Sequence, residues 1–412
     1  MKKICWVTPD YFVDSDNHPT LATDKTCTGC LACVDICPTK ALSDTVNKDG
    51  HLTYTCDTDK CILCHQCERV CPVVSDYQYQ KQGTSKFYAA WCKDDKLRKR
   101  SSSGGAFAAM ATYVINQGGY VVGASNEGIC NIKHVVISDV SELNKLQGSK
   151  YMQSNAAESY KATFGLLKEG HIVLFSGTGC QVAGLLSFLK RKKYSGKLIT
   201  VDLVCGGVPS RLLATKFIEN EPYEVKKILS FRSKDGGWKS TGFIYNLQTE
   251  DSNGNVHDYT GIKNLLTDGF SREMTERYSC YDCHFNGENR ASDFTIGDLW
   301  GDKRFPEQHK DGLSLIIAHN EHADLLLNEM ATLLHLEEVD GKSAIKHNPR
   351  IDNGHNVRGK LFERRHLSWL FDKLSYANLK HIYANDIKSY SPWIVYKIFR
   401  KIRIEILKKI TK

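Results

Sequence analysis

From residue 86 onward, short apolar runs alternate with longer segments of helical character. The runs are rich in β-branched and aromatic residues, as buried strands are, and polar or glycine-containing turns bound them. The predicted strands are 87–92, 120–125, 134–138, 171–176 and 197–205. Between the first two, the stretch SGGAFAAMATYVINQ combines small and apolar side chains, which predicts a buried helix. The alternation predicts an α/β module with at least partly parallel strands, in which ligands bind at the carboxyl ends of the strands.

The segments on either side of this module have different patterns. Residues 76–86 are polar and predict a linker, so we expect an N-terminal unit at 1–80 and the α/β module at 86–345. In the remaining part, 346–412, the pattern predicts a helix at 361–374 and another over the last 20 residues, where isoleucines recur at four-residue spacing. A basic helix of this kind suits an anionic membrane surface or a protein partner. A C-terminal helix packed on the core would show the same spacing.

The net charge is concentrated at the C-terminus. Of the formal +8 over 412 residues, the segment from Lys388 to Lys412 contributes +7, from eight Lys or Arg residues and Glu405. The rest of the chain is close to neutral, which argues against a nucleic-acid interface. The N-terminal pattern predicts no signal peptide, and the sequence has no apolar stretch of about 20 residues. We therefore predict a cytoplasmic protein, free or peripheral on the inner face of the membrane, whose 16 cysteines are reduced and available as metal ligands.

Two cysteine runs in the N-terminal unit share one spacing, C-x2-C-x2-C-x3-C-P. They read CTGCLACVDICP (27–38) and CILCHQCERVCP (61–72). In such runs the first three thiolates bind one cluster and the fourth reaches the other cluster. The predicted 4Fe-4S ligand sets are Cys27, Cys30, Cys33 and Cys71 for one cluster, and Cys61, Cys64, Cys67 and Cys37 for the second. The alternative is a zinc ribbon, which has no use for the third cysteine or the Cys-Pro pair.

About residues 20–80, these runs resemble the bacterial two-cluster ferredoxin domain. The resemblance implies an α+β ferredoxin-like fold for this unit. Cys56 fits neither ligand set, and we interpret it as a buried thiol without a role in the clusters. Cys5, Cys92 and Cys130 likewise have no partner pattern and are expected in the core.

A loop before the buried helix is a candidate anion site. Residues 98–105 read RKRSSSGG and lead into a helix beginning near Ala106. Glycines let the backbone approach a ligand closely, and the free N–H groups of a helix N-terminus favour an anion, so a phosphate or pyrophosphate is physically sensible there. The loop matches neither the dinucleotide fingerprint nor the P-loop. A plain capped helix without a ligand explains the same residues equally well.

Four further cysteines stand at strand ends or turns. They are Cys180 in FSGTGCQVAGL, Cys205 in VDLVCGGVPS, and Cys280 and Cys283 in YSCYDCHF. Because strand ends meet at one edge of a parallel sheet, these thiols are candidates for a third cluster. Two alternatives stay open: a reactive thiolate at Cys180, activated by the N-terminus of a helix, and a zinc or redox role for the Cys280–Cys283 pair.

Six motifs in order now indicate a family. They are SSSGGAF (101–107), LQGSKYMQS (146–154), FSGTGCQVAGL (175–185), VDLVCGGVPS (201–210), FRSKDGGW (231–238), and CYDCHF with SDFTIGDLWG (280–301). Together, over about 86–345, they resemble the beta subunit of coenzyme F420-reducing hydrogenase and dehydrogenase. Two residues depart from the family pattern as we know it: Gly179 replaces a usual proline, and Gly206 replaces a frequent histidine.

The resemblance implies an α/β flavoprotein module that binds FAD. The residues it implies near the flavin are Ser102, Ser103, Gly104, Gly105 and Ala106 at the nucleotide, with Lys150 and Tyr151 nearby. It also implies that Cys180, Cys205, Cys280 and Cys283 hold a cluster beside the flavin. We expect the glycine at 179 to loosen the turn before Cys180, and the glycine at 206 to remove a titratable group from the substrate side.

The combined parts predict an iron-sulfur flavoprotein oxidoreductase. Clusters carry single electrons whereas organic substrates usually exchange two, and a flavin converts between the two. The two-electron substrate implied by the resemblance is coenzyme F420, and the protein partner is a ferredoxin or another oxidoreductase subunit. Two alternatives stay open: a ferredoxin-fed reductase of a polysaccharide or other biosynthetic intermediate, and a non-catalytic electron-transfer subunit of a larger complex. No catalytic residue is assigned.

Overall fold

The structure is a computed structural model that carries side chains. It describes residues 19–75, 84–235, 237–238, 246–259, 265–271, 273–288, 290–352, 355–356 and 374–383. The predicted tail helix, Cys5 and most of the predicted linker lie outside these residues, as does the predicted helix at 361–374 except for its last residue. Among the described residues, no helix is both long and apolar enough to cross a membrane.

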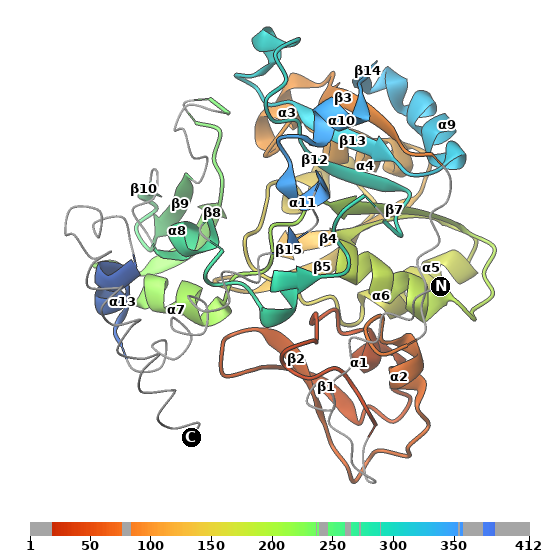
Figure 1. Cartoon of the computed structure of the whole chain (residues 1–412), viewed down its shortest axis with the longest axis vertical. Helices are drawn as coiled ribbons and strands as arrows, with labels where there is room; N and C mark the ends of the chain where they lie inside the picture. Colours follow the sequence, from red (N-terminus) through yellow and green to blue (C-terminus); the bar gives the residue numbers. More distant parts are fainter. Residues whose placement is uncertain are drawn as a thin grey trace, which may run out of the picture.

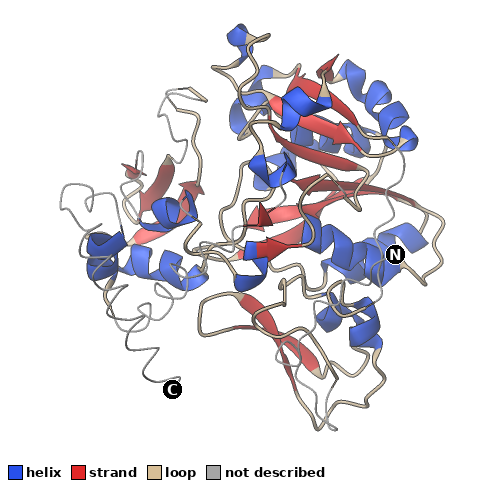
Figure 2. Ribbon diagram, viewed as in Figure 1, coloured by secondary structure: helices blue, strands red, loops and turns tan. Residues whose placement is uncertain are grey.

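The main module is built on one eight-stranded mixed sheet (Figures 1 and 2). In spatial order its strands are β14 (Leu334–Glu338), β3 (Lys86–Cys92), β13 (Ser314–Ala318), β12 (Phe294–Asp298), β7 (Lys197–Leu203), β6 (Ile172–Thr178), β4 (Tyr120–Asn126) and β5 (Ile132–Ile137). The four strands from β12 to β4 are parallel, and the remaining pairs are antiparallel. The prediction of an α/β fold with partly parallel strands is confirmed.

Helices cover both faces of this sheet because its strands are apolar on both sides. The helices are α3 (Asp95–Arg100), α4 (Ala106–Asn116), α5 (Ser159–Lys168), α6 (Gly179–Leu189), α9 (Glu321–Glu329) and α10 (Gly341–Ile345). On β6, Leu174 packs in the cluster that contains α4 and α9, whereas Val173 and Phe175 pack in the cluster with α5 and α6. Successive residues of a strand point to opposite faces, so one apolar run supplies both cores. The result is three layers, helix, sheet and helix.

A smaller lobe lies beside the main sheet, at the left of Figure 1. Its elements are α7 (Arg211–Glu219), β8 (Val225–Ser230), β9 (Leu247–Asp251), β10 (Val256–Tyr259), α8 (Leu265–Ser271) and α13 (Tyr376–Tyr383). The three strands form an antiparallel sheet, and Phe217, Leu265 and Leu379 belong to its apolar core. The remaining short elements lie outside the core of this lobe. They are 3-10 turns at Val140–Lys145, Tyr278–Tyr281, Pro306–Gln308 and Met330–Thr332, strands β11 (Asp282–Cys283) and β15 (His355–Asn356), and helix α11 (Pro349–Asp352).

The N-terminal unit consists of two short helices and a hairpin, drawn at the bottom of Figure 1. These are α1 (Ala32–Ile36), β1 (Leu42–Val46), β2 (Leu52–Cys56) and α2 (Gln66–Val70). The unit is joined to the main module through a shared core, because Ala32 and Val70 pack in one cluster with Val182 and Leu185 of α6. It is therefore packed onto the module rather than held only by the chain connection.

Candidate functional site

The eight cysteines of the two N-terminal runs line two small cavities. Site A comprises Cys27, Cys30, Cys33 and Cys71. Site B comprises Cys37, Cys61, Cys64 and Cys67. Each site takes three thiols from one run and the fourth from the other, which is the grouping that the spacing predicts. Within the described ranges no three His, Cys, Asp or Glu side chains converge on a single metal-ion position, and the thiols of each site instead surround a cavity.

The two runs adopt the same unusual backbone. Gly29 and Leu31 have φ of 64° and 65°, and the equivalent Leu63 and His65 have φ of 50° and 55°. Left-handed φ is rare for residues with a β-carbon, so it persists only where the surrounding structure demands it. Leu31 and His65 are the residues that directly precede α1 and α2. Each run therefore wraps around its cavity and then starts a short helix that carries the third cysteine and leads to the fourth.

Burial makes the thiols of site A unfavourable as free thiolates. It raises the pKa of Cys30 to about 12 and the pKa of Cys71 to about 11, and charges of neighbouring thiols act in the same direction. In site B, burial raises the pKa of Cys67 to about 12. A buried thiolate requires a compensating positive centre, which iron ions supply. The donor set thus fits thiolate-bound iron.

The four later cysteines come together as site C. Site C comprises Cys180, Cys205, Cys280 and Cys283. Cys180 opens α6, Cys205 follows β7, and the other two lie in the turn at Tyr278–Tyr281 and in β11. Burial raises the pKa of Cys280 well above its usual value, and the charges of Cys283, Cys205 and Cys180 raise it further. Burial likewise raises the pKa of Cys180 to about 12, which opposes the alternative of a reactive thiolate at that position.

Sites A and C are neighbours across α6. The charge of Cys30 contributes to the raised pKa of Cys180. A β-carbon added to Gly184 would lie 3.2 Å from Cys30 Sγ, so α6 passes directly against site A. Tyr160 of α5 fixes the same place, since its hydroxyl donates to the Cys30 carbonyl at 2.7 Å. The small residue at position 184 therefore allows the close approach of the two thiol sites.

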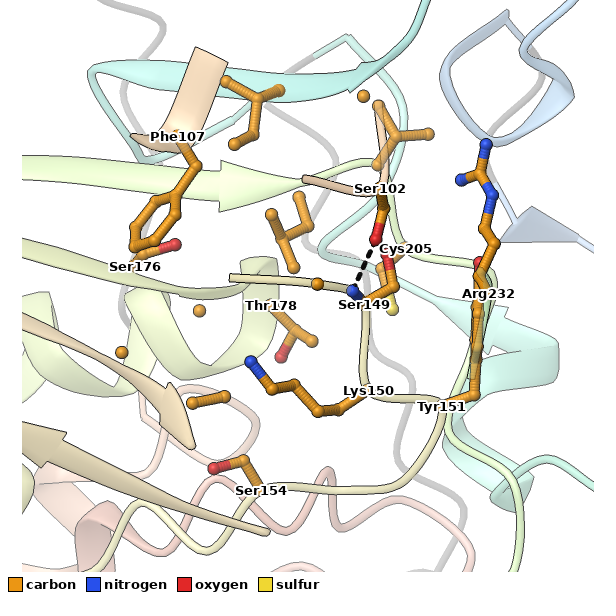
Figure 3. A pocket seen from close by; sticks show the side chains of 18 of the residues that line it. Ser102, Phe107, Ser149, Lys150, Tyr151, Ser154, Ser176, Thr178, Cys205 and Arg232 are labelled. Atoms are coloured by element: carbon orange, nitrogen blue, oxygen red, sulfur yellow. Dashed lines mark hydrogen bonds between the residues drawn. The ribbon is translucent and has the colours of Figure 1, made fainter. Parts of the chain in front are cut away.

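A cavity of about 270 Å³ opens at the carboxyl ends of the parallel strands (Figure 3). The ends of β4, β6, β7 and β12 line it, together with the first turn of α4 and residues 146–154. Cys205 of site C is part of its wall. Of the seven residues predicted near a flavin, six line the cavity: Ser102, Ser103, Gly105, Ala106, Lys150 and Tyr151. Gly104 does not, because it packs between β3 and β13, where a β-carbon would lie 2.5 Å from the Ala90 carbonyl oxygen.

Hydrogen bonds to neighbouring segments fix the serine loop before α4. Ser102 Oγ accepts from the backbone N–H of Ser149 at 2.6 Å, the bond drawn in Figure 3. Ser103 donates to the Leu313 carbonyl at 2.9 Å. The residue before α4, Gly105, has φ of 87° and offers no side-chain cap. The first amides of this 11-residue helix are thus left without a side-chain acceptor beside the cavity, which suits an anion.

The predicted residues Lys150 and Tyr151 are held by protein contacts as well as facing the cavity. Lys150 Nζ donates to the carbonyls of Leu146 and Gln147, both at 2.9 Å, and burial lowers its pKa to about 7. The ring of Tyr151 packs against Phe270, with centroids 4.8 Å apart. Both side chains therefore shape the wall of the cavity.

Comparisons with models of protein families show to which family the chain belongs. Two models describe the N-terminal and C-terminal parts of the family "Coenzyme F420 hydrogenase/dehydrogenase, beta subunit"; residues 87–161 match the first and residues 170–342 match the second. The two matches together span more than half of the chain. The chain belongs to the coenzyme F420 hydrogenase/dehydrogenase beta subunit family. Residues 26–74 match a 4Fe-4S dicluster domain. The chain is thus a beta-subunit-like iron-sulfur protein of an oxidoreductase family.

A comparison with solved structures found a similar chain. The chain is similar to one from the xenon-derivatised F420-reducing NiFe hydrogenase complex of Methanosarcina barkeri, with 16% sequence identity and a TM-score of 0.46. The similarity covers 70% of this chain and 92% of that chain. A search of curated proteins gave no match.

The two departures from the family pattern have structural reasons. Gly179 is the first residue of α6, and a β-carbon there would lie 2.5 Å from the Phe285 carbonyl oxygen. The loosened turn stays a prediction, but the start of this helix is held by a capping box between Thr178 and Gln181, in which the Thr178 N–H donates to Gln181 Oε1 at 3.0 Å. Gly206 lies in the wall of the cavity, and its β-carbon would lie 2.9 Å from the ring of Phe270. Within this beta-subunit-like module, the phenylalanine ring therefore occupies the space beside position 206.

Two residues of the site were not identified from the sequence. His134 lies in the cavity wall between Ser154 Oγ at 2.7 Å and the Ser176 carbonyl at 3.0 Å, and burial lowers its pKa to about 4. Arg277 is fully buried between sites A and C. No local motif indicates His134 or Arg277, because each depends on contacts between segments far apart in the chain. Arg232 and Asp298, which stand in two of the six family motifs, form a buried ion pair at 2.7 Å, and both line the cavity.

Proposed function

We propose that this protein is an FAD-dependent iron-sulfur oxidoreductase that passes electrons between two ferredoxin-type clusters, a third cluster and a two-electron substrate such as coenzyme F420. In this proposal the 4Fe-4S ligands are the cysteines of sites A, B and C. The flavin occupies the cavity beside Cys205. The family membership and the dicluster match are the starting point. The proposal adds the identity of the cofactors and the order of their sites along the molecule.

The observation that carries the proposal is the order of the sites. Site B adjoins site A, since the two runs exchange their fourth cysteines. Site A adjoins site C across α6, and Cys205 of site C lines the main cavity. Three sets of four thiols therefore lead from the exposed loop at Ile62, which is 64% exposed, to the cavity. An uninterrupted series of this kind is what transfer of single electrons over a long distance requires.

The chemistry of the cavity is consistent with a bound flavin nucleotide. The cavity is near the lower end of the roughly 300–1,000 Å³ typical of ligand sites, which suits one ring system with the rest of a dinucleotide along the open side. Two buried polar atoms in its wall, Gln147 Oε1 and Arg232 Nε, have no hydrogen-bond partner among the residues that the structure describes. When bound, a flavin would supply the conversion between single electrons and electron pairs.

The residues around the cavity would then have distinct roles. The uncapped amides at the start of α4, with Ser102 and Ser103, would bind the nucleotide phosphates. Lys150 would add positive charge when protonated, and the neutral His134 would serve as a hydrogen-bonding wall that holds Ser154 and Ser176. Asp298 keeps the charge of Arg232 compensated inside the wall.

Cofactor analysis tests the proposal. After anaerobic purification or reconstitution, we expect about twelve irons, a similar amount of sulfide and one flavin per chain, because three 4Fe-4S clusters and one flavin are proposed. Protein without flavin, or with about four irons, would contradict it. The alanine variant of Cys130, which belongs to none of the three sites, should retain the full content of both.

The identity of the substrate requires a separate experiment. The reduced protein should be reoxidised by coenzyme F420 in proportion to the amount added, and the flavin absorbance should return in the same step. Reoxidation by biosynthetic intermediates instead would favour the ferredoxin-fed reductase. Turnover that appears only after a partner protein is added would favour the electron-transfer subunit.

A further inference from the structure

Arg277 is a buried cation at the junction of the N-terminal unit and the main module. It is 1% exposed, and among the described residues it is the largest side chain that is fully buried. Its backbone N–H donates to the Val208 carbonyl at 3.0 Å, in the segment that follows Cys205, and the Cys280 N–H donates back to the Arg277 carbonyl at 3.0 Å. The backbone of Arg277 is therefore part of the support of site C.

The guanidinium of Arg277 points to the other side, into the N-terminal unit. Nη1 donates to the Cys27 carbonyl at 2.9 Å, and Nη2 donates to Gln153 Oε1 at 2.8 Å and to the Leu52 carbonyl. Nε is buried and has no acceptor in the described part of the chain. Among the described residues no carboxylate lies within ion-pair distance of this guanidinium. The buried Arg232 and Arg290 differ, because Asp298 and Asp202 pair with them at 2.7 and 3.2 Å.

A buried guanidinium without a carboxylate costs several kcal/mol unless another anion compensates it. The thiolates of sites A and C are the anions that can compensate the guanidinium of Arg277. The charge of Arg277 favours the thiolate forms of Cys180 and Cys280, against the burial that raises the pKa of both. Its hydrogen bond to Cys27 places the same charge beside site A. A cluster held by four thiolates is a net anion, and it becomes more negative on reduction.

The first cysteine run is adapted to this contact. A β-carbon on Gly29 would lie 2.5 Å from Arg277 Nη2 and 2.6 Å from Gln153 Nε2. The equivalent residue of the second run, Leu63, has a similar backbone but is 39% exposed. Glycine thus occupies the position where the guanidinium docks, and a large side chain occupies the equivalent position where it does not. The approach of Arg277 is a specific feature of site A.

We propose that Arg277 is the shared counter-ion of the clusters at sites A and C, and that its positive charge raises the reduction potentials of both. The part concerning site C rests on the proposed third cluster, whereas the part concerning site A rests on the dicluster domain alone. A positive charge stabilises the added electron, and potentials respond to net charge and hydrogen bonds near the sulfurs. Arg277 therefore makes sites A and C better electron acceptors than their thiols alone would be.

Redox titration followed by electron paramagnetic resonance tests this role in the full-length, reconstituted protein. R277Q removes the charge, and R277K keeps it while removing the fork of donors. S279A is a matched control, because the Ser279 hydroxyl donates to the same Cys27 carbonyl at 2.9 Å but is neutral. R211Q is a second control, because Arg211 donates to the Cys130 carbonyl at 2.6 Å, away from the three sites.

In R277Q, the ratio of reduced to oxidised cluster A at a fixed potential should fall about tenfold, which is about 59 mV for a one-electron couple. Cluster C should shift in the same direction. R277K, S279A and R211Q should stay within about threefold of the wild type. An iron-replete R277Q with unchanged potentials would overturn the proposal, and so would an equal fall in S279A or R211Q.

Two further outcomes are also decisive. If R277Q does not retain iron, R277M removes the charge with a side chain that can fill the buried space: a tenfold fall at cluster A supports the role of the charge, and unchanged potentials overturn it. If the wild type holds about eight irons, the third cluster of the proposed function fails, and the shift of cluster A alone then tests Arg277.

Discussion

Sites A and B share one cysteine spacing and one backbone conformation but lie in different surroundings. Site A faces α5, α6 and the buried Arg277, and three of its four cysteines are buried. Site B faces outward, with Ile62 and Leu63 exposed at its loop and only Cys67 buried among its cysteines. The repeat of the motif therefore does not make the two sites equivalent. The packing of the main module distinguishes an interior site from a site near the surface.

In our proposal, this difference gives the two clusters different places on the electron path. An electron carrier would meet site B, where the chain is exposed, and site A would pass the electron inward to site C. Cluster potentials depend on burial, charge and hydrogen bonds to sulfur, so clusters in these surroundings should be distinguishable by spectroscopy. The following predictions test or extend this distinction.

The largest effect is expected from the fourth cysteine of each run. C71S should remove about four irons and the signal of the cluster at site A, although Cys71 belongs to the second run. C37S should instead remove the cluster at site B. Because site A shares a core with α6, we also expect C71S to lower the melting temperature more than C37S.

Iron analysis, electron paramagnetic resonance and thermal unfolding of the two variants check this prediction. C130S serves as the control, since Cys130 contacts Thr215 and Arg211 rather than a thiol site. If each variant lost the cluster of its own run, the exchange of the fourth ligand would be wrong. Equal loss of stability would remove the distinction between the two sites.

The proposed cluster at site C should be lost independently of the two N-terminal clusters. C283S should remove about four irons while the two N-terminal clusters keep their signals, because its ligands come from the main module. Electron flow from the N-terminal clusters to the flavin should fall by at least tenfold. Iron content and the rate of flavin reduction by dithionite-reduced clusters measure the two effects. Unchanged iron in C283S would show that site C holds no cluster.

How much was predictable depended on how local each feature is. Cys27 to Cys37 form one short run, so the fixed spacing alone predicted the grouping of thiols that line sites A and B. The strands β6 and β7, with their ends within two residues, and the start of helix α4 were also predicted, because their apolar patterns are local. The ligands of site C are up to 103 positions apart; their places at strand ends and turns made them candidates with alternatives left open, and the resemblance to a family was needed to favour one shared site. Arg277 and His134 carry no local signal, since their roles arise from contacts with distant segments.

A smaller effect is expected where α6 approaches site A. G184L places a side chain where a β-carbon already lies 3.2 Å from Cys30 Sγ and 3.3 Å from the Tyr160 hydroxyl. Overpacking of this kind typically costs about 1–3 kcal/mol of the free energy of unfolding. G165L is the matched control, because a β-carbon on Gly165 of α5 meets no atom within 4 Å. Denaturant unfolding should show a loss in G184L and none in G165L. A loss of equal size in both would mean that close packing against site A is not the cause.

The smallest effect concerns a carboxyl group in the same buried surroundings. Glu276 is 0% exposed, and burial raises its pKa to about 8, although Tyr281 donates a hydrogen bond to its Oε2 at 2.9 Å. The folded protein therefore binds more protons than the unfolded chain between about pH 4.5 and pH 8, so stability falls as the pH rises through this window. The slope is at most about 1.4 kcal/mol per pH unit. E276Q is neutral at every pH and should not show this loss.

Unfolding free energies at pH 6 and pH 7 separate the contribution of Glu276 from other titrations. The wild type should lose about 1 kcal/mol more than E276Q over this step, because ionisation of Glu276 is penalised only in the folded state. E307Q serves as the control, since Glu307 is exposed and its substitution should leave the pH dependence of the wild type unchanged. Parallel pH profiles for the wild type and E276Q would contradict the prediction. Such profiles would mean that the low-polarity surroundings inferred for sites A and C do not include the side chain of Glu276, which directly precedes Arg277 in the chain.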